Sequence, residues 1–327
     1  EPASLRAAAR WSASTDTSSA TVGLVRPQPQ RWARRGIDTL VDSTRRRFGN
    51  DGDDQRLRSR TVAAMSPTVA SLNAGVQSIT ESWKSQRGER QARRHLDQGD
   101  FDALRDAGFL LTVVPVEMGG LWTDTATSAR TVCEVVRLLA TADPAVSLVS
   151  AMHPSVVAFW LCNPDPSQPE WEDQRQAVLA SAAAGEQWGT ITSEPGSGGD
   201  IARTRAKASP TDDVAFMTGR SYAVTGDKHF GSGSGIADRM VTTAIPEGED
   251  EPAIFALDAS DRRWDGSGGW TLLAEWDGVG MVATQSHAMR LESTPAVRLA
   301  HHGPLSVITS GAGALIATLF TASILGV

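Results

Sequence analysis

Apolar residues recur every three or four positions in the first half of the chain, which is the spacing of amphipathic helices. Residues 60–85 carry such a stripe. Asp143 followed by Pro144 is typical of a helix start, with a capping side chain and a proline in the first turn. Residues 172–184 predict a further helix. We therefore predict an N-terminal helical domain over residues 56–185.

The pattern changes between residues 186 and 302, where short runs rich in Thr and Val are separated by Gly, Pro and Asp. No periodic segment of helix length interrupts these runs, which argues against alternating β-α units. We therefore predict a middle domain with an antiparallel β structure. Its expected strands lie at residues 220–225, 239–244, 253–257 and 270–274.

The two ends of the chain differ from the rest. Residues 1–55 show no apolar period and are rich in Arg and Ser, so we predict a poorly ordered leader, with a transit peptide as the alternative. Residues 303–327 carry no charge and are long enough to span a bilayer. Their glycines and hydroxyl residues favour instead a buried helix that begins a C-terminal helical bundle. The predicted fold class is α+β and multidomain.

The composition excludes several classes of protein. The 327 residues have a formal net charge of −7, divided into +5 over residues 1–60 and −12 over the remainder. This division indicates a basic leader ahead of an acidic body, and we expect no nucleic-acid partner. Two cysteines are too few for a disulfide scaffold or a four-cysteine zinc site, and six scattered histidines give no metal motif. We expect a reduced compartment, the cytoplasm or alternatively the mitochondrial matrix.

Two loops combine glycine with hydroxyl side chains, and each follows an expected strand. The first spans residues 190–200 and the second residues 226–235. Glycine lets a backbone approach a ligand closely, and hydroxyl and N–H groups bind carbonyl, ring-nitrogen or phosphate atoms. Phe230, in the second loop, is suited to stacking on a planar cofactor. Two ordinary β-loops are the alternative interpretation, so the residue types alone leave ligand binding open.

The order of motifs along residues 60–327 resembles that of the acyl-CoA dehydrogenase superfamily. The two loop motifs are specific only when they occur together at this spacing. The motifs that carry the resemblance are Phe101-x-x-Leu104-x-x-x-Gly108, Val114-Pro115-x-Glu117-x-Gly119-Gly120, Thr192-Ser193-Glu194-Pro195-Gly196-Ser197-Gly198-Gly199-Asp200, Gly226-Asp227-Lys228-His229-Phe230, Ala237-Asp238, and Trp276-Asp277-Gly278-Val279-Gly280 followed by Thr284, Ser286 and His287.

The resemblance implies a helical domain, a β domain and a C-terminal four-helix bundle, with FAD bound between the last two. It implies flavin contacts from Thr190, Thr192 and Ser193 in the first loop and from Phe230 and Ser232 in the second. FMN, or reduced flavin used as a co-substrate, is the alternative cofactor.

The resemblance also places Gly198 and Gly199 near the thioester substrate, and Gly199 stands where the family more often has serine. Glu194, on the same loop, is a structural residue in the family rather than a base. No metal site is implied.

The reaction that the resemblance implies is α,β-dehydrogenation of an acyl-CoA thioester, with hydride transfer to FAD. In the family the base is a glutamate of the C-terminal bundle, so we expect it beyond Val327 and expect this chain to be catalytically incomplete. One alternative is a two-component flavin-dependent monooxygenase, because Phe230-Gly231-Ser232-Gly233 resembles that branch of the superfamily. The other is a non-catalytic remnant. The expected partners are acyl-CoA, an electron-accepting flavoprotein or a flavin reductase, and further copies of the chain in a homo-oligomer.

A few other side chains are assigned to packing or to the surface. His153 lies on an apolar helix stripe and is predicted to be a core histidine. Cys133 and Cys162 are predicted to be buried on helices. His287 is predicted to lie in a turn, and the pair 301–302 to be an exposed strand end.

Overall fold

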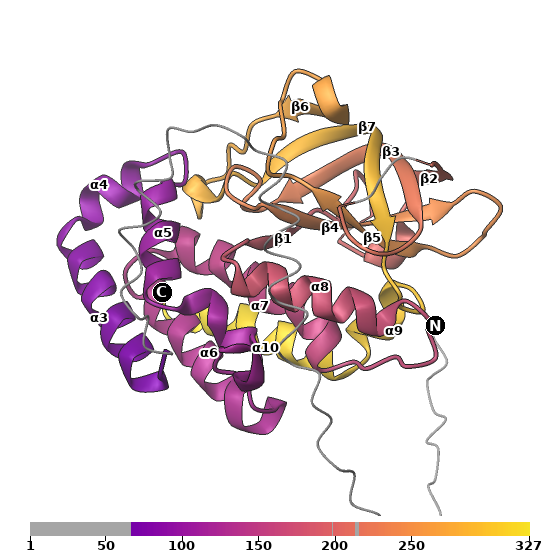
Figure 1. Ribbon diagram of the computed structural model, residues 1–327. Coiled ribbons are helices and arrows are strands. Elements are labelled where there is room, and N and C mark those ends of the chain that lie inside the picture. The colour runs from indigo at the N-terminus through magenta and orange to yellow at the C-terminus, as the bar shows by residue number, and fades with distance from the viewer. Residues whose placement is uncertain (1–66, 198, 213–215) are drawn as a thin grey trace, which may run out of the picture. The chain divides into compact units, whose positions relative to one another are not determined.

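A computed structural model describes residues 67–197, 199–212 and 216–327 of the chain (Figure 1). These residues belong to one compact unit, Met65–Val327. The predicted leader at residues 1–55 and the start of the expected helix at residues 60–85 lie outside the described residues.

Helices come first along the described chain, as the apolar spacing predicts. The six α-helices before the sheet are α3 (Val69–Ser85), α4 (Arg87–Ala92), α5 (Gln98–Asp106), α6 (Thr125–Ala140), α7 (Pro144–Leu161) and α8 (Trp171–Ala183). The short 3₁₀ turns are η1 (Phe109–Val113), η2 (Val116–Met118), η3 (Ile201–Arg203), η4 (Ser267–Gly269) and η5 (Val282–Thr284).

Polar side chains define where these helices begin. Asp143 accepts the N–H groups of Ala145 and Val146 at the start of α7, and Pro144 occupies the first turn, which confirms the predicted start. Thr68 and Ser71 form a reciprocal capping box at the start of α3.

Helix α7 is the central helix. It is the one helix of the described residues that is long and apolar enough to cross a membrane, but 83% of it is buried inside the protein. Helices α6 and α10 and strand β1 pack around it. His153 lies in its middle, where Nε2 is 3.3 Å from the carbonyl oxygen of Leu110 and Nδ1 accepts the N–H of Trp188. The prediction of a core histidine is therefore confirmed, and burial lowers its pKa to about 4.

The sheet follows the helices and closes on itself. Strand order is β1-β4-β2-β3-β7-β5, with β6 beside β7 and β4 paired with β5, so the first and last parts of the order meet. The seven strands are β1 (Trp188–Thr190), β2 (Lys207–Pro210), β3 (Ser221–Gly231), β4 (Arg239–Pro246), β5 (Ala253–Asp258), β6 (Trp270–Ala274) and β7 (His287–Arg298).

The expectation of a wholly antiparallel sheet was wrong in one place. Strands β1 and β2 both run parallel to β4, with Trp188 opposite Arg239 and Lys207 opposite Ile245. The reason is that the chain travels along one edge of β4 twice in the same direction, first as β1 and then as β2. The other pairings are antiparallel.

Two apolar clusters hold the described residues together. One fills the interior of the closed sheet and includes Tyr222, Met240, Phe255, Leu257, Trp270 and Met289. The other joins the helices to the outer face of β4 and β5 and continues into the C-terminal helices. The helices thus cover one side of the sheet (Figure 1).

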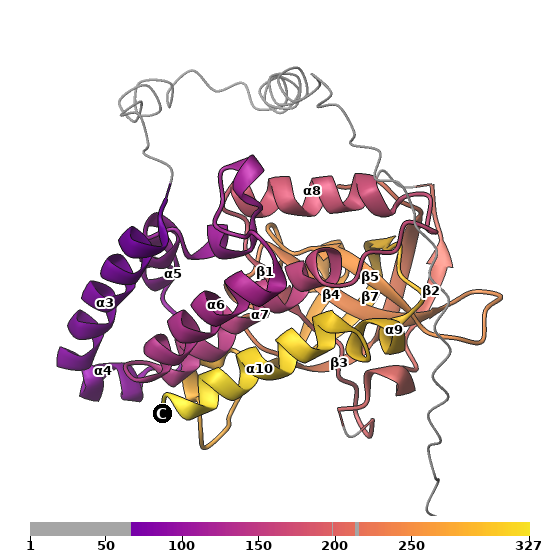
Figure 2. The same ribbon diagram turned by 90° about the horizontal axis from the view of Figure 1, so that it is seen from below.

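The predicted single helix at residues 303–327 is divided into α9 (Pro304–Ile308) and α10 (Gly311–Leu325). Figure 2 shows α10 beside α6 and α7, and contacts between these helices agree with it. Gly311 lets α10 come close to the carbonyl of Cys162, where a Cβ atom would lie 2.9 Å from that oxygen. Leu305, Ile324 and Leu325 remain exposed.

The histidine pair at the end of the sheet differs from the prediction. His302 is exposed as expected, but His301 is only 4% exposed. Its ring packs edge-on against Phe159 and Trp160, at centroid distances of 6.0 and 5.3 Å. Neither ring nitrogen has a hydrogen-bond partner among the described residues, and burial lowers the pKa to about 4. The aromatic neighbours explain the burial, because the ring completes their cluster.

The two cysteines are half-buried rather than fully buried. Burial is the largest influence on both thiols and raises both pKa values, which keeps the thiols protonated and unreactive.

We expect the substitution His301→Phe to raise stability at neutral pH by about 1–2 kcal/mol, because it removes unpaired buried nitrogens and keeps the aromatic contacts. That corresponds to a rise in Tm of roughly 2–6 °C. The folded-state pKa of His301 lies below the unfolded value, so its contribution to stability is lost as pH falls from about 6.5 toward 4. The variant should lose part of this pH dependence in calorimetry.

The matched control is His302→Phe, since His302 is exposed and hydrogen-bonds with Gln168. His302→Phe should give no gain in stability. A lower Tm for His301→Phe at neutral pH would show that the ring nitrogens are satisfied in solution.

Candidate functional site

The first loop leaves the sheet between two strands that share one edge of β4. Strand β1 pairs with residues 239–241 and β2 with residues 245–246, and the chain between them projects from that edge. The prediction that residues 226–235 form a loop was wrong for its first half, because pairing with β7 extends β3 through Gly231, and the chain leaves the strand only at Ser232. The carbonyl of Ser193 accepts the N–H of His229 at 2.8 Å, which joins the two loops. We call the residues 190–193 and 229–232 the two-loop surface.

Three hydroxyl residues of the first loop are half-buried on this surface. Thr190 Oγ1 lies 3.6 Å from the sulfur of Met152 on α7. The hydroxyls of Thr192 and Ser193 have no hydrogen-bond partner among the described residues. Both hydroxyls therefore remain able to donate to and accept from a ligand.

Phe230 is 58% exposed and lies in the left-handed region, with φ of 55°. A left-handed conformation costs about 1–2 kcal/mol for a residue with a Cβ atom. Its ring meets Trp276 edge to face, at a centroid distance of 5.9 Å. A strained backbone that presents a large apolar ring to solvent is a frequent property of ligand sites.

Ser232 differs from the other predicted cofactor residues because its hydroxyl is engaged within the protein. It is buried and lies 2.8 Å from the hydroxyl of Ser286, which lies 2.7 Å from that of Thr284. The N–H of Gly233 also donates to the carbonyl of Thr284. The structure thus places Ser232 beneath the surface, as an anchor of the second loop on residues 281–287.

The sequence did not predict that residues 276–287 belong to the site, although their motif contributes to the family resemblance. Met281 and Gln285 both have positive φ, of 51° and 47°. His287, predicted to lie in a turn, instead opens β7, is buried and accepts the N–H of Trp276 at 2.9 Å. The pairing of β7 with β3 draws it into the sheet. Trp276 reaches the exposed part of the two-loop surface through its ring contact with Phe230.

Of the two predicted substrate residues, Gly198 lies outside the described residues and Gly199 is exposed. Gly199 has a φ of 84°, and no atom lies within 4 Å of where its Cβ would be. Backbone conformation, rather than space, therefore requires glycine at this position.

A buried ion pair lies directly below the two-loop surface. Lys228 Nζ donates to Glu194 Oε1 at 2.6 Å, and the side chains are 0% and 3% exposed. Burial opposes the ionisation of Glu194, but hydrogen bonds from Lys228 and Thr204 outweigh it and lower its pKa. Burial lowers the pKa of Lys228, and the Glu194 carboxylate opposes that shift. With its oxygens bound in this way, Glu194 is not available as a base, in agreement with its predicted structural role.

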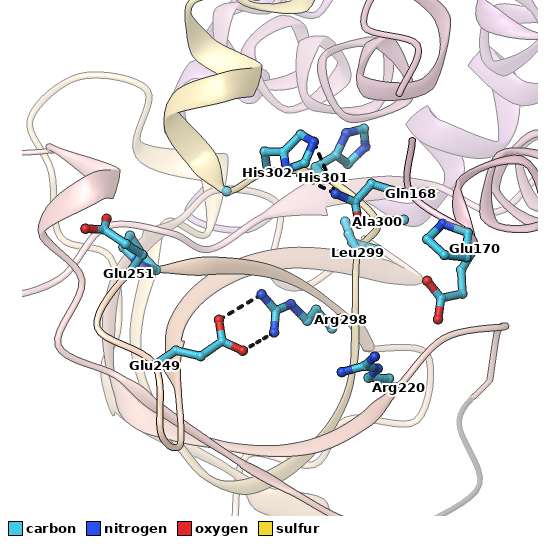
Figure 3. Close-up of a pocket in the computed structure, with 13 residues that line it drawn as sticks. Gln168, Glu170, Arg220, Glu249, Glu251, Arg298, Leu299, Ala300, His301 and His302 are labelled. Carbon is cyan, nitrogen blue, oxygen red and sulfur yellow. Dashed lines mark hydrogen bonds and ion pairs between the residues drawn. The ribbon is translucent and has the colours of Figure 1, made fainter. Parts of the chain in front are cut away.

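A separate cavity of about 370 Å³ lies beside α9 (Figure 3). Arg298 pairs with Glu249 across it, and Gln168 bonds to His302 at its wall. Its charged groups carry both signs and partly satisfy one another, so it indicates no ligand class. No cluster of three metal-binding side chains exists among the described residues.

No known protein family matches the sequence, and no curated protein matches it. Solved structures do resemble the fold. The FMN-bound form of TdsC, the dibenzothiophene monooxygenase of Paenibacillus sp. A11-2, is 23% identical, with a TM-score of 0.62 over 79% of this chain and 62% of that chain. Methanesulfinate monooxygenase MsuC of Pseudomonas fluorescens is 22% identical, with a TM-score of 0.59 over 77% and 59% of the two chains.

Butyryl-CoA dehydrogenase of Megasphaera elsdenii is 19% identical, with a TM-score of 0.57 over 79% of this chain and 63% of that chain. The chain thus spans about three fifths of the length of the structures it resembles. The similarity confirms a mixed α+β fold, which flavin monooxygenases and an acyl-CoA dehydrogenase share, and the division into domains stays a prediction.

We expect Gly199→Ala to destabilise the protein by about 1 kcal/mol, because alanine is strained at positive φ. The matched control is Gly88→Ala in α4, where φ is not positive and no atom obstructs a Cβ. There the same substitution should stabilise by about 0.5–1 kcal/mol. Urea unfolding measures both. Equal effects of the two variants would contradict the described conformation of the first loop.

Proposed function

We propose that the protein binds a flavin on the two-loop surface and acts as a flavin-dependent oxidoreductase. The observation that carries this proposal is the exposed ring of Phe230, held in a strained conformation beside the unpaired hydroxyls of Thr192 and Ser193. An isoalloxazine ring is planar, with an apolar face and a polar edge, and this combination of groups suits it. FMN-bound TdsC, which has the same fold, supports the choice of ligand.

The residues of the chain would hold the ring from one side. Phe230 would pack on its apolar face, and the hydroxyls of Thr192 and Ser193 would bond to its carbonyl and nitrogen atoms. Thr190 is the last residue of β1, and its Oγ1 lies 3.6 Å from the sulfur of Met152, so its contribution is contact rather than a strong hydrogen bond. A bound flavin supplies electron transfer in one-electron or two-electron steps.

Two reactions agree with this fold, and both are proposals for this chain. The first is α,β-dehydrogenation of an acyl-CoA thioester with FAD, which butyryl-CoA dehydrogenase supports. It requires a carboxylate base at the substrate. An acyl-CoA substrate, an electron-accepting flavoprotein, a homo-oligomer and a cytoplasmic location would accompany it.

The second candidate is monooxygenation with reduced flavin supplied by a reductase. The engaged carboxylate of Glu194 does not decide between the two reactions, because the resemblance gives Glu194 a structural role and places the base of the first reaction on another element. TdsC and MsuC, which are monooxygenases, support the second candidate by similarity of fold.

We expect the purified chain to bind FMN or FAD, measured by quenching of flavin fluorescence. Ser193→Ala should raise Kd by about fivefold, and Phe230→Ala by about tenfold, because each removes one ligand contact. The matched control is Ser260→Ala, an exposed serine that bonds to Asp258 away from the two-loop surface. It should leave Kd unchanged. Failure of the chain to bind either flavin would refute the proposed function.

We expect an acyl-CoA added without oxygen to leave the bound flavin oxidised, because Glu194 is held by Lys228 and no other described residue is assigned as the base. Rapid loss of the oxidised flavin spectrum would support dehydrogenation and show that another base is present. With NADH, a flavin reductase and oxygen, incorporation of oxygen into an aromatic substrate would support the second candidate.

A further inference from the structure

The buried pair below the two-loop surface has more partners than an ordinary ion pair. Lys228 Nζ donates to Glu194 Oε1, to Thr204 Oγ1 at 3.2 Å and to the carbonyl of Thr243 at 2.7 Å. Its ammonium group therefore has an acceptor for each of its three hydrogens.

Glu194 is equally saturated. It accepts the ammonium of Lys228, the hydroxyl of Thr204, the N–H of Arg205 at 2.7 Å and the N–H of Ala206 at 3.1 Å. The carboxylate thus joins the first loop to residues 204–206, which precede β2, and Lys228 of β3 joins both to β4.

The position of the pair in the sequence matters as much as its partners. Glu194 directly follows Ser193, and Lys228 comes two residues before Phe230. The backbone hydrogen bond from His229 to Ser193 lies between these points. A displacement of either charged residue would therefore move the hydroxyls and the aromatic ring relative to each other.

Stability alone does not account for such a pair. Removal of two charges from water is costly, and uncharged residues of similar volume are often as stabilising. A buried ion pair selects one arrangement of the chain more strongly than uncharged residues do, because its partners must meet with defined geometry.

We propose that Lys228 and Glu194 are positioning residues that hold the two loops in register for flavin binding. The inference rests on the proposed function, but it makes a structural claim that can be tested without flavin. Neither residue touches the ligand in this proposal; both act through Ser193 and Phe230.

The experiment uses the double variant Lys228→Met with Glu194→Gln in the full chain, because the single lysine variant would leave a buried carboxylate unpaired. The matched control is Arg90→Met with Asp100→Asn and Asp143→Asn, because the buried Arg90 bonds to both carboxylates, at 2.7 and 2.9 Å. Arg90 lies in α4, Asp100 in α5 and Asp143 at the start of α7. We expect both variants to fold, and Kd for FMN to rise about tenfold only in the first.

A double-mutant cycle separates positioning from a general loss of order. Ser193→Ala should raise Kd by about fivefold in the natural background and by less than about twofold in the Lys228→Met, Glu194→Gln background. The reason is that a hydroxyl already displaced from the ligand contributes little to binding, so its removal changes Kd little. An equal fold-increase in Kd on Ser193→Ala in the two backgrounds would overturn the proposal.

Hydrogen exchange provides the measurement that needs no ligand. The amide of His229, which bonds to Ser193, should exchange at least about tenfold faster in the Lys228→Met, Glu194→Gln variant than in the control of matched stability. If the chain binds no flavin but exchange accelerates, the proposed function fails and the positioning of the loops stands. If exchange at His229 is unchanged, the pair does not hold the loops, and the inference fails whatever the flavin does.

Discussion

The need to bury α7 on nearly every side is the constraint on which the rest of the structure depends. An apolar helix of this length cannot face water, so α6, α10 and β1 must cover it. His153 is the one histidine inside it, and its two nitrogens join the helix to Leu110 and to Trp188 of β1. His153 therefore fixes the register between the helices and the sheet, which apolar contact alone would not fix.

The same helix sets the position of the candidate site. A Cβ atom on Gly233 would lie 2.6 Å from Val149, so the second loop approaches α7 as closely as glycine allows. Ser232 and Thr284 then hold this loop from below, and Lys228 holds it to the first loop. The strain at Phe230 persists because these contacts determine the backbone on both sides of it.

The sequence predicted the main helices and strands β3, β4, β5 and β6, because these follow from local apolar spacing, but it did not predict β7, which pairs with three strands. It missed the parallel placement of β1 and β2, which depends on one edge of β4 serving two short strands far apart in the chain. It predicted an exposed His301, because nothing local shows that Phe159 and Trp160 surround that ring. The site residues were predicted from loop composition and family resemblance. Neither predicts that the hydroxyl of Ser232 is bonded within the protein or which groups bond to Glu194, because both depend on long-range packing.

The open geometry of the two-loop surface also limits what it can do alone. Phe230 is exposed, and so one face of a planar ligand would rest on the ring while the opposite face would meet water or another polypeptide. Hydride transfer and oxygen activation both depend on excluding water from the reacting atoms. Binding and chemistry therefore make different demands here. In the proposed function the loops would account for recognition of a flat ring, whereas catalysis of either kind would need a second wall, whose residues would decide between the two reactions.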